Sequence, residues 1–181
     1  IVIRVDMIQT KNYLLKPLVS DDLGPEYFGW LKDEEATRHL FVHGTPLEEV
    51  EIKQHVDSYD GENDFFWGIF TNTNKMIGTH SYAFSPQHKR CSMGVMIGDK
   101  SYWGKNDVVE IRTAILDFAF YSQGCVKAEA GCYKNNVAAI YNFQRLGWKK
   151  EGVKRSHRQI DGEREDLILF GLLKEEWDGR V

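Results

Sequence analysis

A loop between a predicted strand and a predicted helix carries the most suggestive residues of the chain. It runs from Met93 to Glu110 and includes Gly104 and Lys105. The first N–H groups of a helix lack partners within the helix, and the helix dipole adds positive potential there, so such a junction suits a diphosphate. Gly104 permits close approach of a ligand, and Lys105 adds positive charge. The alternative is a plain connection in which Asp107 caps the helix and Glu110 completes a capping box.

Another group of residues follows one predicted strand later, in segment 135–148. Asn136 is a suitable residue to begin a helix there, and Gly147 is a suitable residue to end it. By itself this segment is a capped amphipathic helix, which is common in globular proteins. Its position after the loop is the informative part.

In this order and spacing, the loop and the capped helix resemble the GNAT superfamily of N-acetyltransferases. The loop is similar to the family's binding loop for the acetyl-CoA pyrophosphate. The capped helix is similar to the helix that follows it in the family, here with Asn136, Ala139 and Leu146-Gly147-Trp148. The opening 13–22 and the ending 161–177 also resemble the subgroup that includes ribosomal-protein N-terminal and spermidine acetyltransferases. The resemblance covers about residues 12–177.

The resemblance implies a co-substrate, an acceptor and a set of binding residues. The co-substrate is acetyl-CoA and the acceptor is an amine, which attacks the thioester directly, without a covalent enzyme intermediate. A main-chain N–H near Met96 or Ile97 polarises the thioester carbonyl. The residues assigned to the cofactor are Met96, Ile97, Gly98, Trp103, Gly104, Lys105, Asn106, Asp107, Val108, Val109, Asn136, Ala139, Asn142 and Phe143.

The loop departs from the family pattern Gln/Arg-x-x-Gly-x-Gly/Ala. The matching positions hold Trp103, Asn106 and Val108. Asparagine tolerates a left-handed backbone, but valine is bulkier than glycine or alanine, and Asp107 is an anion near the expected phosphate seat. These departures motivate an alternative function, a catalytically degenerate domain that binds an acyl-CoA.

A further departure lies at Phe143, where many relatives carry a tyrosine that protonates the departing thiolate. Phenylalanine cannot donate this proton. A thiolate with an ordinary pKa of ~8.5 is nevertheless a tolerable leaving group, so the change does not by itself abolish activity. Tyr141 is two residues away on the helix and points elsewhere.

A general base is needed because most amines are protonated at neutral pH. The strand residues His80 and Glu129 are the candidates, although each also suits a purely structural role. A covalent acetyl-cysteine route through Cys132, activated by His80, is an alternative. Buried strand cysteines more often act as small apolar residues.

The histidines and cysteines give no sign of a metal site. His39 and His43 have the spacing of the HExxH motif but lack its glutamate, so they are assigned to a loop on the acceptor side. Cys91, Cys125 and Cys132 show neither CxxC spacing nor an even number. Reduced thiols and no metal are expected.

Length and composition limit the class of protein. The chain has 181 residues, which suits one acetyltransferase domain, 1–181. Its 42% hydrophobic and 28% charged residues are ordinary for a globular protein. The net charge is −4 and both signs are interspersed, so the sequence gives no sign of binding to nucleic acid or an anionic membrane. No apolar run reaches the ~20 residues of a membrane span and no signal-peptide pattern opens the chain, so a cytoplasmic protein is expected.

The predicted elements give an α/β fold. Strands are expected at 12–17, 65–71, 76–84, 91–98, 126–133, 148–155 and 164–173, and helices at about 20–31, 45–59, 108–124 and 136–147. Asp161-Gly162 suits a type I′ turn between the last two strands. The order predicts a mixed, mostly antiparallel sheet of about six to seven strands with helices on both faces, similar to the GNAT fold.

The acceptor class stays open at the level of sequence. The leading hypothesis is a primary amine of a small molecule, either an amino sugar or another metabolite. A protein N-terminus is a close competitor. Spermidine ranks third because no dense acidic cluster for a polycation is evident. The resemblance also allows a homodimer, because relatives often form one.

Overall fold

The computed structural model describes residues 7–105 and 107–178 and divides the chain into two compact units. The first unit comprises residues 1–83 and 95–107, and the second comprises 84–94 and 108–181. Strands β4 and β5 each contribute to both units. The assignment of a single acetyltransferase domain stays a prediction.

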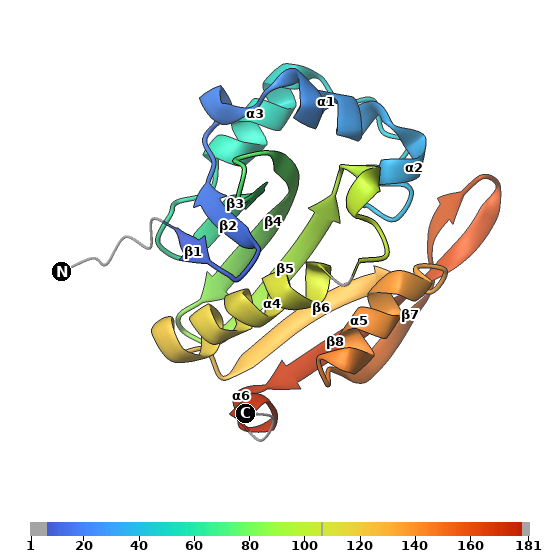
Figure 1. Ribbon diagram of the computed structural model, residues 1–181. Helices are drawn as coiled ribbons and strands as arrows, with labels where there is room; N and C mark the ends of the chain where they lie inside the picture. Colours follow the sequence, from blue (N-terminus) through green and yellow to red (C-terminus); the bar gives the residue numbers. More distant parts are fainter. Residues whose placement is uncertain (1–6, 106, 179–181) are drawn as a thin grey trace. The chain divides into compact units, whose positions relative to one another are not determined.

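Within residues 7–105 and 107–178, eight strands have the order β1-β2-β3-β4-β5-β6-β8-β7 (Figure 1). Their bounds are Ile8–Gln9 (β1), Tyr13–Pro17 (β2), Asp64–Thr71 (β3), Met76–Ser85 (β4), Arg90–Ile97 (β5), Lys127–Tyr133 (β6), Lys149–Ile160 (β7) and Glu163–Leu173 (β8). β5 and β6 are parallel, whereas β1–β2, β2–β3, β3–β4, β6–β8 and β7–β8 are antiparallel. The mixed, mostly antiparallel sheet is confirmed, and the two-residue β1 makes the strand number eight rather than six to seven.

The first helix of the first unit begins later than predicted. The expected helix from Ser20 is a 3₁₀ turn at Ser20–Asp22, followed by α1 at Pro25–Lys32. Gly24 takes the N-cap position and Pro25 the first helical position, where a missing N–H costs no hydrogen bond. The short α2, Glu34–Thr37, follows and is capped by Asp33, whose side chain accepts hydrogen bonds from two main-chain N–H groups.

The start of α3 also differs from the prediction. The predicted helix begins at about residue 45, whereas the helix is Glu49–Asp57 with Glu48 as its N-cap. The Glu51 carboxylate accepts a hydrogen bond from the Glu48 N–H at 3.1 Å, which completes a capping box about one turn after the predicted start.

The core of the first unit joins α1 and α3 to the sheet. Its buried residues come from β3, β5, α1, α3 and the segment before α1, and they are Leu18, Leu23, Tyr27, Phe28, Ile52, Val56, Phe66 and Met96. Tyr27 contacts Phe28 and Phe66 edge to face, with ring centroids 6.0 and 6.2 Å apart. This packing places the end of β5 beneath α1.

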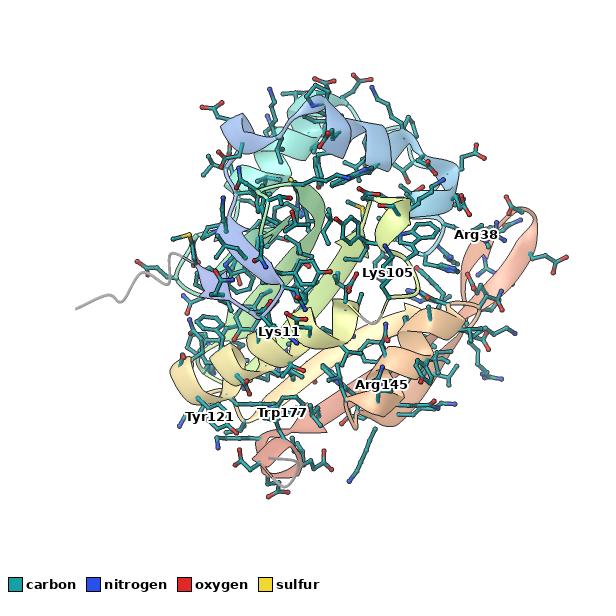
Figure 2. All side chains as sticks on the ribbon, in the orientation of Figure 1. Lys11, Arg38, Lys105, Tyr121, Arg145 and Trp177 are labelled. Carbon is teal, nitrogen blue, oxygen red and sulfur yellow. The ribbon has the colours of Figure 1, made fainter. Side chains whose placement is uncertain are left out.

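The second unit packs α4 and α5 against β6 and β8. The helix α4, Asp107–Asp117, continues as a π-helical turn over Phe118–Ser122, and α5 is Val137–Arg145. The last helix, α6, is Lys174–Asp178. It is held to the end of α4 by hydrogen bonds from Trp177 Nε1 to Asp117 and from the Tyr121 hydroxyl to Asp178, at 2.8 and 2.7 Å (Figure 2 labels Tyr121 and Trp177).

The β7–β8 hairpin turns at the predicted dipeptide. Asp161 and Gly162 have φ values of 50° and 82°, and positive φ at both central residues is the signature of a type I′ turn. β7 carries a register shift between Lys154 and Arg158, where Ser156 adopts a φ of 53°. The Ser156 N–H donates to the Asp166 carboxylate at 2.7 Å, which holds this irregular stretch to β8.

Candidate functional site

The loop after β5 is held in shape by its own side chains. The Trp103 indole Nε1–H donates to the Ile97 carbonyl at 2.8 Å and closes the loop onto the end of the strand. Asp99 accepts from the Ser101 N–H and hydroxyl at 2.9 and 2.7 Å, and it pairs with Lys75 at 2.6 Å. The hydrogen bond from Lys75 is the main reason that the pKa of Asp99 falls to about 2. Trp103, at the matching position of the family's glutamine or arginine, therefore has an anchoring role in the loop.

Gly104 and Lys105 form the exposed tip of this loop. Gly104 has a φ of 75°, a conformation that favours glycine, and a Cβ added to it meets no atom within 4 Å. The Lys105 ammonium lies 5.0 Å from the centre of the Tyr102 ring (Figure 2). Open space and a nearby cation are the features that the sequence led us to expect at a phosphate seat. Asn106 lies outside the described residues.

Gly98 and Met96 serve the packing of the first unit. A Cβ on Gly98 would lie 2.0 Å from the ring of Trp30 in α1, so this position requires a glycine. The Gly98 N–H donates to the Ile77 carbonyl at 2.9 Å, and the Met96 side chain is buried in the core. The cofactor role of Met96, Ile97 and Gly98 stays a prediction.

The start of α4 differs from the alternative in which Asp107 is the N-cap. The structure places Asp107 within the helix. Its Oδ2 is buried and has no hydrogen-bond partner among the residues that the structure describes. The first-turn N–H groups, among them those of Val108 and Val109, have no acceptors within the helix itself. The helix end thus offers donors to a phosphate, with one carboxylate nearby that opposes an anion.

The start of α5 confirms Asn136 as a cap. Its side-chain oxygen accepts a hydrogen bond from the Ala139 N–H at 3.1 Å. Farther along the helix, Phe143 is fully buried; it stacks on Phe170 with ring centroids 4.5 Å apart and meets Trp148 edge to face at 5.1 Å. The structure therefore brings Phe143 into the core of the second unit, where it can contribute contacts and no proton.

Arg112 is a buried cation that the sequence analysis did not identify. Only 4% of the residue is exposed, and its guanidinium carbon lies 4.3 Å from the centre of the Phe143 ring. Its Nε and Nη1 have no hydrogen-bond partner within the described part of the chain. Burial lowers the pKa of Arg112 to about 10, so the side chain is still cationic at neutral pH. The available signal was an arginine inside the apolar stripe of the helix, four residues after Val108 and three before Ile115.

The three thiols are buried. Cys91, Cys125 and Cys132 all belong to the second unit and form no disulfide. Burial raises the pKa of Cys132 to about 11, and the nearby charge of Arg112 offsets only part of that effect. Cys91 and Cys125 are in hydrogen-bond contact with each other. A neutral, buried Cys132 is poorly suited to the covalent acetyl-cysteine route.

The two candidate bases belong to different units and have different surroundings. His80 is fully buried in β4 and lies opposite Trp67 of β3, with ring centroids 6.4 Å apart. Glu129 of β6 is ion-paired with Arg90 through Oε2 and with Lys127 through Oε1, the latter at 3.5 Å. Both oxygens of Glu129 are therefore engaged by cations, which makes His80 the better candidate. The role of either residue stays a prediction.

The loop with His39 and His43 follows α2. The hydroxyl of Thr37 lies 3.1 Å from His43 Nδ1, which ties the loop to the end of α2. In residues 7–105 and 107–178 no three histidine, cysteine or acidic side chains are grouped for a metal ion. No helix of the same residues is long and apolar enough to cross a membrane.

A surface groove lies between α1 and α3 of the first unit. Its volume is about 430 Å³, which is within the range of small-molecule sites. It is lined by Leu23, Pro25, Phe28, Gly29, Lys32, Glu49 and Lys53. Two lysines and one glutamate give it a mixed, slightly cationic rim.

Comparison with known sequences identifies a family. Residues 12–149 match the acetyltransferase (GNAT) domain model. An uncharacterised N-acetyltransferase, p20 of Bacillus licheniformis, is 26% identical over 97% of this chain and 100% of its own length. The ribosomal protein uS5-alanine N-acetyltransferase of Escherichia coli K12 is 28% identical over 62% of this chain and 59% of its own.

Comparison with solved structures finds the same fold. RimL, a ribosomal L7/L12 α-N-protein acetyltransferase, superimposes with a TM-score of 0.81 at 17% identity, covering 94% of this chain and 99% of that one. That structure contains coenzyme A joined to a cysteine through a disulfide. An acetyltransferase structure from T. thermophilus gives a TM-score of 0.76 at 26% identity, covering 96% and 92% of the two chains.

Proposed function

Because the chain belongs to the GNAT acetyltransferase family and uses acetyl-CoA, we propose that it transfers the acetyl group directly to a primary amine in a ternary complex. In this reaction the amine nitrogen attacks the thioester carbonyl, the carbon–sulfur bond breaks, and the sulfur leaves with its electron pair. No acyl-enzyme forms.

The observation that carries direct transfer is the state of the cysteines. All three are buried, and burial raises the pKa of Cys132 to about 11, so very little thiolate exists at neutral pH. A thiolate rather than a thiol is the nucleophile in cysteine catalysis. The acceptor amine is therefore the better nucleophile for the thioester.

The proposed seat of the cofactor diphosphate is the segment 103–109. Gly104 leaves open space, Lys105 adds a cation, and the first turn of α4 offers N–H groups. The carboxylate of Asp107, whose Oδ2 is buried, works against this seat, because a negative charge repels a diphosphate. We take the donors to prevail, since several N–H groups and a lysine act against one carboxylate.

The proposed acceptor is a small molecule, such as an amino sugar or another metabolite amine. The groove between α1 and α3 has a volume of about 430 Å³, which suits a ligand of that size, although its two lysines disfavour a protonated amine. Removal of the amine proton is proposed to involve His80, directly or through water.

A second candidate acceptor is the N-terminus of a protein. Two findings favour it: the ribosomal protein uS5-alanine N-acetyltransferase among the sequence relatives and RimL among the solved structures. Both act on ribosomal proteins by name. For this chain, an assay with both kinds of acceptor distinguishes the two classes.

The test is a thiol-release assay with acetyl-CoA over two panels of acceptors. One panel contains amino sugars, with and without nucleotide groups, and metabolite amines; the other contains peptides with free N-termini. If thiol release with the first panel exceeds the rate of acetyl-CoA hydrolysis, the small-molecule acceptor is supported. If only the peptides increase thiol release, the acceptor is a protein N-terminus instead.

Two further outcomes would overturn the proposal. If acetyl-CoA binds tightly but no acceptor of either panel is acetylated, the chain is instead a catalytically degenerate domain that binds an acyl-CoA. Acetylation of Cys132 during turnover, detected by mass spectrometry of the quenched enzyme, would replace direct transfer by the covalent route. A Cys132→Ser variant that keeps its turnover supports direct transfer.

A further inference from the structure

Within the described residues, the guanidinium of Arg112 has no counterion. It is 96% buried, and neither its Nε nor its Nη1 has a hydrogen-bond partner in 7–105 or 107–178. The groups next to it are the Phe143 ring at 4.3 Å and the thiol of Cys132, whose raised pKa of about 11 keeps it neutral. These three side chains come from α4, α5 and β6, all in the second unit.

A buried cation of this kind is costly for the fold. Charged groups are rarely buried unless they are paired, because the loss of hydration is compensated only by a partner charge or by hydrogen bonds. The contact with the aromatic ring supplies part of this compensation. The two unused N–H donors are therefore poised for an acceptor that a substrate brings.

Three kinds of negatively charged group take part in the proposed reaction: the phosphates of coenzyme A, the carbonyl oxygen during attack, and the departing sulfur. The diphosphate is assigned to the first turn of α4. Arg112 is five residues beyond Asp107, roughly 7.5 Å farther along the helix axis, which places it away from that turn. The carbonyl oxygen is assigned to a main-chain N–H near Met96 or Ile97. The remaining group is the sulfur of coenzyme A, which becomes a thiolate as the acetyl group departs.

We propose that Arg112, supported on the ring of Phe143, binds the thiolate of the departing coenzyme A through its free N–H groups. The proposal deepens the proposed function and rests on it. It also accounts for the residue beneath the guanidinium: Phe143 cannot protonate the sulfur, and a fixed positive charge stabilises a thiolate without any proton transfer.

The step is balanced. As the carbon–sulfur bond breaks, the electron pair stays on sulfur, and the charge that develops there faces the guanidinium. The proton lost by the attacking amine goes to the base or to water, and the thiolate takes its own proton from solvent after release. No oxidant or further reactant is required.

The experiment compares the binding of coenzyme A with that of desulfo-coenzyme A, which lacks only the thiol. Affinities are measured by calorimetry in reducing buffer, for the wild-type enzyme and for Arg112→Leu. If Arg112 lowers the pKa of the bound thiol by about one unit, the wild type should prefer coenzyme A about fivefold at a pH near the ordinary thiol pKa of ~8.5. Arg112→Leu should bind both ligands within about twofold of each other, because it has no cation to stabilise the thiolate.

The pH dependence provides a readout that a purely structural role of Arg112 would not change. In the wild type the preference for coenzyme A should grow as the pH rises from neutral toward the thiol pKa, since only the thiolate is stabilised. In Arg112→Leu the ratio of the two affinities should not change with pH. Arg112→Lys, which keeps the charge but loses the planar stack, should keep part of the preference.

The controls separate failure of this inference from failure of the proposed function. Arg145, an exposed residue of α5, lies over the Tyr141 ring at 5.9 Å (Figure 2), and Arg145→Leu should leave the ratio at the wild-type value. If wild type and Arg112→Leu show the same ratio while acetyl-CoA binds both and is turned over, the role of Arg112 is wrong and the proposed function stands. If acetyl-CoA does not bind the wild type, both are wrong.

Folding of the key variant is checked by thermal unfolding. Replacing a buried, unpaired charge by an apolar residue of similar volume is often neutral or stabilising. Arg112→Leu should therefore unfold at the same or a higher temperature than the wild type. In turnover it should lose about 10²-fold in kcat, the usual effect of removing one electrostatic contact to a developing charge.

Discussion

The Arg112 guanidinium lies 4.3 Å from the centre of the Phe143 ring, and this contact joins α4 to α5 in the second unit. The same ring stacks on Phe170 of β8, so one aromatic side chain connects both helices to the sheet. The cation and its supporting ring are thus parts of one packed cluster.

This contact should appear as a coupling energy between the two side chains. A double-mutant cycle with Arg112→Leu, Phe143→Leu and the double variant, followed by urea unfolding, should give a coupling of about 1–2 kcal/mol, as expected for a desolvated cation–π contact. Phe143→Leu alone should cost about 2–3 kcal/mol through lost volume and stacking. Additive effects of the two substitutions would contradict the contact.

Gly98→Ala should destabilise the protein because the new methyl group would enter the Trp30 ring at 2.0 Å. Overpacking of this kind costs about 1–3 kcal/mol in unfolding free energy, measured by chemical denaturation. Gly29→Ala is the matched control in α1: a Cβ there meets nothing within 4 Å, and alanine should stabilise the helix by about 0.5–1 kcal/mol. Two substitutions of the same type should therefore act in opposite directions.

Gly104→Ala should weaken binding of acetyl-CoA. Alanine is strained at a φ of 75°, and a reshaped loop tip no longer fits a diphosphate. A loss of about 1 kcal/mol, or about fivefold in Kd, is expected in a fluorescence or calorimetric titration. Gly61→Ala, at a φ of 70° and also with open space around it, carries the same backbone strain and should leave the Kd unchanged.

The ion pair between Asp99 and Lys75 should make stability depend on acid pH. The hydrogen bond from Lys75 lowers the pKa of Asp99 to about 2, below its unfolded value of ~3.9, so the stabilisation is present above about pH 4 and is lost as the pH falls toward 2. Lys75 is half exposed, which limits the effect to about 1 kcal/mol.

Asp99→Asn is the variant that tests this pair. In urea unfolding, the free energy of unfolding of this variant should fall below that of the wild type. The difference should be largest near neutral pH and should shrink between about pH 4 and about pH 2. Lys75→Met should reproduce the same pattern. A deficit that is constant across this pH range would assign the effect to packing rather than to charge.

Most of the sheet could be predicted from local sequence, because β-branched and aromatic runs are interrupted by strong turn residues. The Asp161-Gly162 hairpin is the best example, since the type I′ turn needs positive φ at both residues and the dipeptide supplies it. The start of α3 could not be predicted as well: Thr45, Pro46 and Glu48 together have the pattern of a helix start, but in the folded chain Glu48 is the N-cap and Glu51 completes the capping box.

The candidate site was predicted where it depends on the main chain and was missed where it depends on long-range packing. Gly104 and the Asn136 cap follow from local backbone chemistry. Arg112 was missed because arginine in an apolar stripe usually reaches solvent along its flexible stem. Only the fold shows that Phe143 holds its guanidinium in the interior.

The indole of Trp103 gives this protein a built-in optical probe. Trp103 is 40% exposed in the loop proposed for the diphosphate, whereas three other tryptophans are buried: Trp67, Trp148 and Trp177. A water-borne quencher should reach the first ring far more readily than these three. Occupancy of the loop can then be followed as shielding of the Trp103 emission, beside a contribution from the partly buried Trp30, with no dye attached and before any acceptor for the enzyme has been identified.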